Sequence, residues 1–534
     1  MAKRKREATT LQSSAPNSKT RKIAVAKPGP VYIQIIAGSY EKVLHGIIAG
    51  VPREVLQPDE TKSAEAKSTG KENGVAESTG QEEETEKSKD DALEITFADT
   101  FMFNAHSSAI RCLTLSPVPS PNDTSQKLLL ASGSNDERVN LYNLSTTPPH
   151  DLVSRPPHAK AAAQLPSLSG VKVSQNSLNK ELGALDHHNG PITGILFPSR
   201  GKMITASEDN TIAIARTRDW TVLSTIKAPV PKALNRPSGD TFAPGEVPAG
   251  VNDFAVHPSM KLMLSVGKGE KCMRLWNLVT GKKAGVLSFE REVLEAVGEG
   301  KYATGEGRRI EWDEEGEEFV VGFERGAVVF DIECKVRSVV VPRPSTKVHQ
   351  MAYVREVEGN VLAVSTEDGR ILFFDTAQAS GQETNGTDSK GKEAIPHAKL
   401  IAQLGGRALG VSSRIKDFSI LSHPTTSAPT TETTVSRNLV ITTASSDGVI
   451  RLWSLSTGEL DIAREAAIAA GEKVPQVGHL LAQYETGNRI TCLAAFVMNE
   501  KSGGVGEADV GEESEFGGFS EAGGEESSEE SESE

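Results

Sequence analysis

The chain has 534 residues, with 58 Lys or Arg and 72 Asp or Glu, so its formal net charge at pH 7 is −14. It contains no apolar run of membrane-spanning length and no apolar signal-peptide core, so we expect a soluble intracellular protein without membrane contact. Its four cysteines, Cys112, Cys272, Cys334 and Cys492, lack the paired spacing of a zinc site, which argues against a metal centre and suits buried thiols in a reducing compartment.

The first 30 residues are basic and begin with the run Lys3, Arg4, Lys5 and Arg6. Such a run at a chain end is typical of a nuclear import signal or of an arm that binds phosphate groups. A solvated tail without a role is a third interpretation. We expect residues 1–30 to be disordered and favour import, which predicts a protein of the nucleus or nucleolus.

Two apolar strands are predicted in residues 31–50, on either side of a polar turn at Tyr40, Glu41 and Lys42. Residues 52–94 follow as an acidic insertion, which buries too little apolar surface to fold and is expected to be disordered. Residues 95–103 then supply an outer strand. This unit lacks an inner strand before it in the sequence.

Six later segments share one pattern, in which an apolar strand leads through a polar turn into a second strand. They lie at 131–143, 205–216, 264–277, 320–331, 363–375 and 444–454. The last, ASSDGVIRLWS, is the clearest and resembles the core of a WD40 repeat. One such unit cannot bury its own faces, so the copies must stack into a closed ring. The sequence therefore predicts an all-β fold, a seven-bladed WD40 β-propeller over residues 31–497.

The copies are spaced more widely than the roughly 40–45 residues of a lean WD40 repeat. Polar loops at 146–180, 229–249, 378–397 and 423–437 account for the excess, because the entropic cost of closing a loop rises slowly with its length. After an outer strand at 480–485 comes one more strand, 490–497, with no repeat behind it. We predict that this strand pairs near residues 32–38, completes the first blade and leaves the ring without an exposed sheet edge.

Polar residues recur at fixed places in three repeats, where the WD40 resemblance implies a buried network of His, Ser or Thr, Asp and an aromatic side chain. The first set is His106, Ser132, Asp136 and Tyr142, with Tyr in place of Trp. The second is His187 or His188 with Thr205 and Asp209, and Ala215 leaves the aromatic position empty. The third is Thr443, Asp447 and Trp453, with no His before the inner strand.

A set of His, Ser and Asp can also be a hydrolase triad, but satisfaction of buried polar groups is the favoured interpretation. GEGRRI at 305–310 resembles the start of a dinucleotide fingerprint, yet it precedes a strand instead of following one. No phosphate loop or nucleophile elbow is present. We predict a non-catalytic protein without cofactor or small-molecule substrate, which recognises partners through its loops and propeller faces.

Residues 498–534 are acidic, end in ESSEESESE and carry most of the net negative charge. We expect a disordered tail. Ser527 and Ser531 each have a Glu three residues on, the arrangement that acidophilic kinases prefer, and are candidates for phosphorylation. The tail would either contact a basic partner through charge or act as a solubilising extension. Without the two tails and the 52–94 insertion the chain is nearly neutral, so it offers no overall basic field for nucleic acid.

The segment IIAGSYEKVLHGI resembles the opening of the PAK-interacting-protein-1-like family of WD-repeat proteins, whose fungal members are called maintenance-of-killer proteins. FNAHSSAIRCLTLS (103–116), the segment 256–284 and NRITCLAAFV (488–497) follow the family's order and spacing. The resemblance covers roughly residues 31–500 apart from the insertions. Ala215 and the missing His before the last repeat depart from the family pattern.

This resemblance implies a nucleolar scaffold in pre-60S assembly and rRNA maturation. Its implied partners are pre-60S assembly factors and ribosomal or ribosomal-like proteins, with at most peripheral rRNA contact, and the protein would be a monomer within a large particle. Animal relatives are also described as negative regulators of a p21-activated kinase, so a signalling adaptor is the alternative. A cullin-ligase receptor is disfavoured, because neither Trp276 nor Trp453 is followed by the Asp and Arg that such receptors favour.

Overall fold

The structure is a computed structural model that describes residues 29–56, 95–119, 127–149, 152, 176, 178–231, 249–300, 303–357, 359–379, 395–422, 437–466 and 474–499. Within these ranges, 28 strands form seven antiparallel sheets of four strands each. The predicted all-β, seven-bladed propeller is confirmed.

Each sheet is one blade, and its four strands follow one another from the channel outward. Blade 1 is β28 (Ile490–Val497), β1 (Val31–Ser39), β2 (Val43–Val51) and β3 (Thr96–Asn104); blade 2 is β4 (Ile110–Leu115), β5 (Lys127–Ser134), β6 (Val139–Ser145) and β7 (Lys180–Leu185). Blade 3 is β8 (Ile192–Ser199), β9 (Lys202–Ser207), β10 (Thr211–Arg216) and β11 (Val222–Lys227); blade 4 is β12 (Val251–Val256), β13 (Leu262–Gly267), β14 (Cys272–Asn277) and β15 (Lys282–Ser288).

The remaining three blades have the same order. Blade 5 is β16 (Arg309–Trp312), β17 (Glu318–Gly322), β18 (Ala327–Asp331) and β19 (Val336–Val340); blade 6 is β20 (Val348–Val354), β21 (Val361–Thr366), β22 (Arg370–Ala379) and β23 (Ala398–Gly405). Blade 7 is β24 (Ile415–Ser422), β25 (Asn438–Ser445), β26 (Val449–Ser456) and β27 (His479–Glu485). Strand β22 runs to Ala379 and so extends into the loop that was predicted to begin at residue 378.

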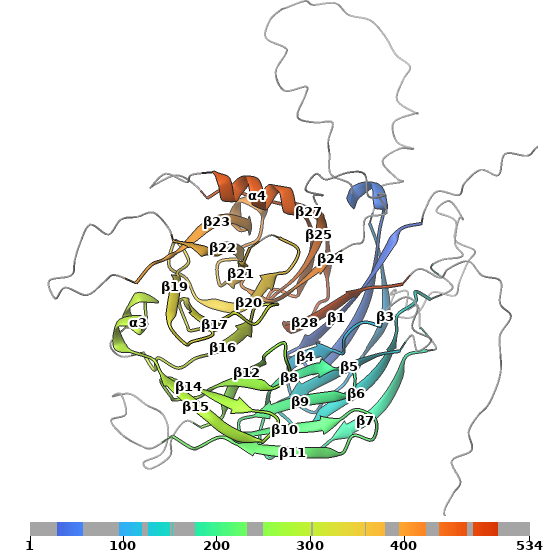
Figure 1. The fold of residues 1–534 in the computed structure, drawn as a ribbon. Helices are drawn as coiled ribbons and strands as arrows, with labels where there is room; N and C mark the ends of the chain where they lie inside the picture. The colour runs from blue at the N-terminus through green and yellow to red at the C-terminus, as the bar shows by residue number, and fades with distance from the viewer. Residues whose placement is uncertain are drawn as a thin grey trace, which may run out of the picture. The chain divides into compact units, whose positions relative to one another are not determined.

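Blade 1 is built from both ends of the propeller sequence, since β28 lies directly beside β1 (Figure 1). The two strands are antiparallel, with Ile33 opposite Val497 and Ser39 opposite Ile490. The predicted pairing of residues 490–497 with the first blade is therefore confirmed. The innermost strands then contact one another in the cyclic order β28, β4, β8, β12, β16, β20, β24 and back to β28, which closes the ring.

The core lies between the blades. Seven clusters of buried apolar side chains occur in the described residues, and each joins two consecutive blades. Successive residues of a strand point to opposite faces of its sheet, so a blade that is apolar on both faces contributes to two clusters. Trp453 packs in this way against blade 6, and Trp276 packs against blade 3.

Four short helices with defined bounds accompany the strands in the part of the chain that the structure describes, and none was predicted. They are η1 (Arg53–Leu56), α3 (Arg291–Ala296), η2 (Arg407–Leu409) and α4 (Thr457–Glu465). Helix α4 buries Leu460 and Ala463 in the cluster between blades 6 and 7, and α3 buries Val293 and Leu294 between blades 4 and 5. Helices this short have too few turns for a clear hydrophobic period, and they are stabilised by packing against the blades.

Most residues of the two tails and of the predicted insertions lie outside the described residues. The predictions of disorder for 1–30, 52–94 and 498–534, and of loops for 146–180, 229–249, 378–397 and 423–437, concern mainly those residues and stay predictions. The strands that flank the last of these loops, β24 and β25, end at Ser422 and begin at Asn438 as its predicted bounds require.

Truncation after Gly487 removes β28 and should unfold or aggregate the protein. The truncated chain leaves β1 as a sheet edge and uncovers Ile33 and Ile35, which are fully buried; such an apolar edge promotes association between chains. Size-exclusion chromatography and thermal unfolding measure the effect, with truncation after Asn499 as the matched control. A chain ending at Gly487 that stays monomeric and melts like the control would contradict the closure.

Candidate functional site

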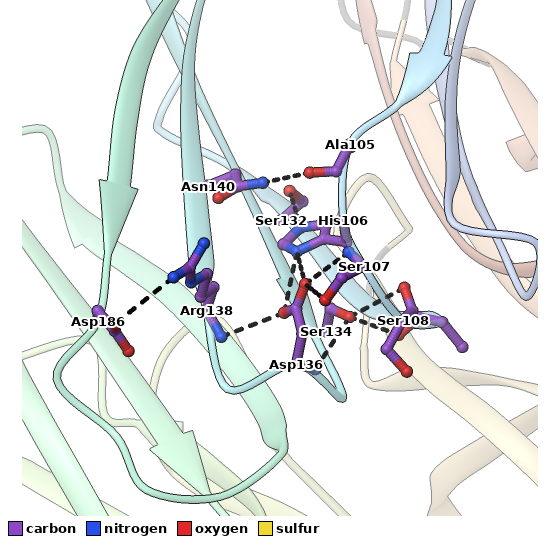
Figure 2. A network of polar contacts seen from close by, with 11 residues as sticks. Ala105, His106, Ser107, Ser108, Ser132, Ser134, Asp136, Arg138, Asn140 and Asp186 are labelled. Atoms are coloured by element: carbon purple, nitrogen blue, oxygen red, sulfur yellow. Dashed lines mark hydrogen bonds and ion pairs between the residues drawn. The ribbon is translucent and has the colours of Figure 1, made fainter.

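The blade 2 network joins the loop before β4 to the turn between β5 and β6 (Figure 2). His106 Nδ1 lies 3.1 Å from both carboxylate oxygens of Asp136, and its Nε2 lies 2.8 Å from Ser132 Oγ. Asp136 also accepts hydrogen bonds from the backbone N–H groups of Ser107 at 2.9 Å and Arg138 at 3.2 Å. The imidazole therefore links the carboxylate in the turn to a hydroxyl on the second strand.

This network is closed to a dissolved substrate, because the His106 side chain has no exposed surface and that of Asp136 is 8% exposed. Burial lowers the pKa of His106 despite the opposing charge of Asp136. Burial acts to raise the pKa of Asp136, but hydrogen bonds from Ser107 and Arg138 and the nearby imidazole outweigh it and hold that pKa below its ordinary value. Near neutral pH the pair is a neutral imidazole bonded to a carboxylate, which is a structural arrangement.

Tyr142 of β6 occupies the aromatic position of blade 2. Burial raises the pKa of its phenol. Its ring lies 5.7 Å from that of Phe103 on β3, in an edge-to-face arrangement. The aromatic side chain thus contributes to the contact between blades 1 and 2.

In blade 3 the sequence left His187 and His188 as alternatives, and the structure brings both to Thr205. The Nε2 atom of each histidine lies 2.8 Å from Thr205 Oγ1. His188 Nδ1 in addition lies 2.9 Å from Thr211 Oγ1 and 3.4 Å from Asp209 Oδ2, so His188 corresponds to His106 of blade 2. Burial, together with the charge of His188, lowers the pKa of His187 to about 4.

Ala215 is buried at the aromatic position of blade 3, in the cluster that joins blades 2 and 3. Trp220, from the turn between β10 and β11, packs against the same cluster. A large aromatic side chain therefore reaches this interface from the turn after the third strand. The backbone of Trp220 is left-handed, with φ of 57°, and sequence periodicity does not predict such a turn.

Blade 7 lacks the histidine, and an arginine from its third strand takes its place. Arg451 Nη2 lies 3.4 Å from Asp447 Oδ2, and its Nη1 lies 3.1 Å from Ser445 Oγ. Asp447 also accepts hydrogen bonds from Ser413 Oγ at 2.7 Å and from the Val449 N–H at 3.1 Å. Trp453 Nε1 donates separately to Thr443 Oγ1 at 3.2 Å. The predicted set of Thr443, Asp447 and Trp453 thus forms two separate contacts, one at Asp447 and one between Trp453 and Thr443. Arg451, which binds Asp447, lies opposite Thr443 in the strand pairing.

The same arrangement occurs in blade 4, where the sequence did not reveal a network. The Arg274 guanidinium binds both carboxylate oxygens of Glu270, with an Nη2–Oε1 distance of 2.5 Å. Trp276 Nε1 donates to Ser265 Oγ at 2.8 Å. The sequence does carry a signal for this contact, which is an acid in the turn followed four residues later by an arginine, as in Asp447 and Arg451. A pattern that requires histidine misses this substitution.

The central channel is lined by the innermost strands, and two aspartates at equivalent positions connect those strands. Asp253 Oδ2 on β12 accepts from the Ile310 N–H of β16 at 3.1 Å, and Asp417 Oδ2 on β24 accepts from the Leu493 N–H of β28 at 2.8 Å. Burial raises the pKa of Asp417 to about 6. These carboxylates therefore join blades 4 to 5 and 7 to 1.

In the described part of the chain, no group of three or more His, Cys, Asp or Glu side chains is arranged to hold a metal ion. The described helices include none that is long and apolar enough to cross a membrane. Lys3, Arg4, Lys5 and Arg6 and the phosphorylation candidates Ser527 and Ser531 lie outside the described residues, and their roles stay predictions.

Asp136→Ala should lower the free energy of unfolding by about 1–3 kcal/mol, because it leaves Nδ1 of the buried His106 without its acceptor. Asp447→Ala should lower it by less than about 1 kcal/mol, because the Asp447 side chain is 33% exposed and water replaces part of what is lost. Urea denaturation measures both changes. Asp186→Ala is the control, since that side chain is 67% exposed and its contact with Arg138 is long, with 3.9 Å between Oδ2 and Nη2. A larger loss for Asp447 than for Asp136 would refute the assigned order.

Comparison with known proteins gives the same fold. The family described as WD domain, G-beta repeat matches residues 98–143 and 179–214, which belong to blades 1 to 3. The protein MAK11 of Saccharomyces cerevisiae is 25% identical over 430 residues, which cover 76% of this chain and 77% of MAK11. The p21-activated protein kinase-interacting protein 1-like protein of Gallus gallus is 26% identical over 340 residues, which cover 63% of this chain and 69% of that protein.

The human p21-activated protein kinase-interacting protein 1 is 25% identical over 244 residues, which cover 46% of this chain and 45% of the human protein. The alignment to MAK11 is too long to reflect one shared repeat. It agrees with the family resemblance of the N-terminal strands and of the repeats. The chain is a β-propeller with WD40 repeats, and it is similar to MAK11 over 76% of its length and to the p21-activated protein kinase-interacting protein 1-like proteins over shorter stretches.

Proposed function

We propose that this protein is a non-catalytic scaffold in the nucleolar assembly of the large ribosomal subunit, and that it acts on pre-60S particles during rRNA maturation. The observation that carries the proposal is the similarity to MAK11 over 76% of this chain and 77% of that protein. The family resemblance of the same repeats implies this role. The aligned part is therefore long enough to span several blades of this chain.

The arrangement of polar side chains supports a scaffold. The His–Asp sets of blades 2 and 3 and the Arg–acid sets of blades 4 and 7 bind groups within their own blades. Their hydrogen-bonding capacity is used to hold turns against strands, so they stabilise a rigid ring. A rigid ring with variable loops is suited to binding several proteins at once.

The proposed partners are pre-60S assembly factors and ribosomal or ribosomal-like proteins. Many such partners are basic, and the acidic residues 498–534 provide a matching charge. An interaction of this kind depends on charge and weakens as salt concentration rises. We place rRNA at most at the periphery of this interaction and expect a monomer within the particle.

The second candidate is a negative regulator of a p21-activated kinase or another signalling adaptor. The names of the Gallus gallus and human relatives favour it, because both describe an interaction with that kinase. The two functions differ in the size of the complex that holds the protein, and sedimentation separates them.

Tagged full-length protein from its own cells should sediment on a sucrose gradient with 60S precursors. The expected result is co-migration with pre-rRNA of the large subunit and a shift to light fractions when rRNA synthesis is inhibited. The inhibited cells are the control for chance co-sedimentation. Protein found only in light fractions together with a kinase would favour the adaptor and reject the scaffold.

Replacing Lys3, Arg4, Lys5 and Arg6 by Ala should remove nucleolar accumulation of a fluorescent fusion. The run precedes β1, so the substitution leaves the blades unchanged, and far-UV circular dichroism verifies this. The matched control replaces the exposed Lys282 and Lys283 of β15 by Ala. Full nucleolar signal in the four-residue variant would show that the run is unnecessary for import.

A further inference from the structure

A pocket of about 370 Å³ lies at the channel mouth where the innermost strands begin, between blades 7, 1 and 2. Its walls come from the turns β1–β2 and β5–β6 and from the starts of β4, β24 and β28. The lining residues are Tyr40, Ala109, Ile110, Arg111, Asn135, Lys416, Arg489, Ile490 and Thr491. The volume lies in the range of pockets that bind small-molecule ligands, about 300–1,000 Å³.

The charged lining residues of this pocket are all cations, Arg111, Lys416 and Arg489, in a chain whose net charge is −14. Arg111 is partly compensated, since its Nη1 lies 2.7 Å from Glu208 Oε1. Across the described residues, neither Lys416 nor Arg489 forms an ion pair. The Arg489 guanidinium lies 5.6 Å from the ring centre of Tyr40, which is itself 58% exposed.

The surroundings add positive charge. Burial lowers the pKa of Lys416, and the charges of Arg414 and Arg489 lower it further, against the opposing effect of Glu367. Burial likewise lowers the pKa of His349 on β20 to about 4, and nearby Lys416 and Arg414 contribute to that shift. A half-buried ammonium group without a counter-ion is costly. An anion beside Lys416 would offset that cost.

We propose that this pocket binds an anionic side chain of an acidic segment in a partner protein. Lys416 and Arg489 supply donors for the anion, and the Arg489 guanidinium can hold a carboxylate in two-point geometry. The exposed Tyr40 ring offers an apolar surface for the aliphatic part of the same side chain. The site goes beyond the proposed role in ribosome assembly and does not depend on it.

The rim around the pocket favours a peptide over RNA. Next to the pocket, Glu208 lies between Arg111 and Lys268, and Glu367 pairs with Arg414. Further round the ring, in blades 5 and 6, Glu324 lies between Arg308 and Lys347. Because acids pair with many of these cations, the described residues of this face form no continuous basic stripe along which a sugar-phosphate backbone could run. Lys416 and Arg489, neither of which forms an ion pair in the described residues, line the same pocket, which suits a single acidic side chain.

The test is fluorescence anisotropy with the full-length protein and a labelled decaglutamate peptide at low salt. Lys416→Gln combined with Arg489→Gln should weaken binding at least about tenfold, which the loss of one charge-assisted hydrogen bond can produce. The charge-matched control is Lys282→Gln combined with Lys283→Gln on the exposed face of β15, and it should bind like the unaltered protein. Replacing Lys3, Arg4, Lys5 and Arg6 by Ala should also leave binding unchanged.

Decaglutamine and decauridylate are the comparison probes, and both should bind at least about tenfold more weakly than decaglutamate. Arg489→Glu is the second variant if the pocket double variant lowers the melting temperature, because the Arg489 side chain is exposed and its replacement spares the core. No decaglutamate binding by the unaltered protein, or equal weakening by the pocket and control variants, would overturn the site. Tighter binding of decauridylate that the pocket variants abolish would reassign it to RNA.

Discussion

The antiparallel pairing of β28 with β1 is the interaction on which the rest of the structure depends. It brings residues 490–497 beside residues 33–39 and supplies the innermost strand that the N-terminal unit lacks. Without β28 the sheet of blade 1 ends at β1, and the apolar clusters with blades 2 and 7 lose one of their walls. Asp417 strengthens the same junction from blade 7, since it accepts a hydrogen bond from the Leu493 N–H at 2.8 Å. The ring is therefore held by main-chain pairing, apolar packing and one buried carboxylate at the point where the first and last strands of the propeller meet.

Four of the blades satisfy an acid in a turn in one of two chemical ways. Each of four tight turns between a second and a third strand carries an acid that needs donors close to the blade. In blades 2 and 3 a buried histidine reaches it from the loop before the inner strand. In blades 4 and 7 an arginine four residues further along the third strand reaches it instead. The turn of blade 7 also requires glycine at position 448, where φ is 85° and a Cβ would lie 2.7 Å from the Asn488 carbonyl oxygen.

These networks account for most of the residues that resemble catalytic groups, because each is bonded inside its own blade. Two cations at the channel mouth are not bonded in this way. There Lys416 and Arg489 keep positive charge without an ion-pair partner in the described residues, whereas Arg111 pairs with Glu208 and Arg414 with Glu367. The proposed binding of an acidic side chain depends on these two cations.

The sequence by itself determined the all-β class, the seven blades, the closing strand and the grouping of His106, Ser132 and Asp136 in blade 2. Period-two patterns, polar turns and repeated motifs are local signals, and the surplus strand at 490–497 left one pairing open.

Tertiary structure decided which side chains complete the polar network in each blade. It selected His188 over His187 as the partner of Asp209, placed Trp220 beside Ala215, replaced histidine by Arg274 and Arg451, and formed helices α3 and α4 against the blades. It also brought Arg111, Lys416 and Arg489 to one pocket, although Lys416 is far from Arg111 in the chain. These outcomes depend on which side chains meet across a turn or between blades. Residues that ring closure brings together are far apart in the chain, so local sequence patterns do not predict their contacts.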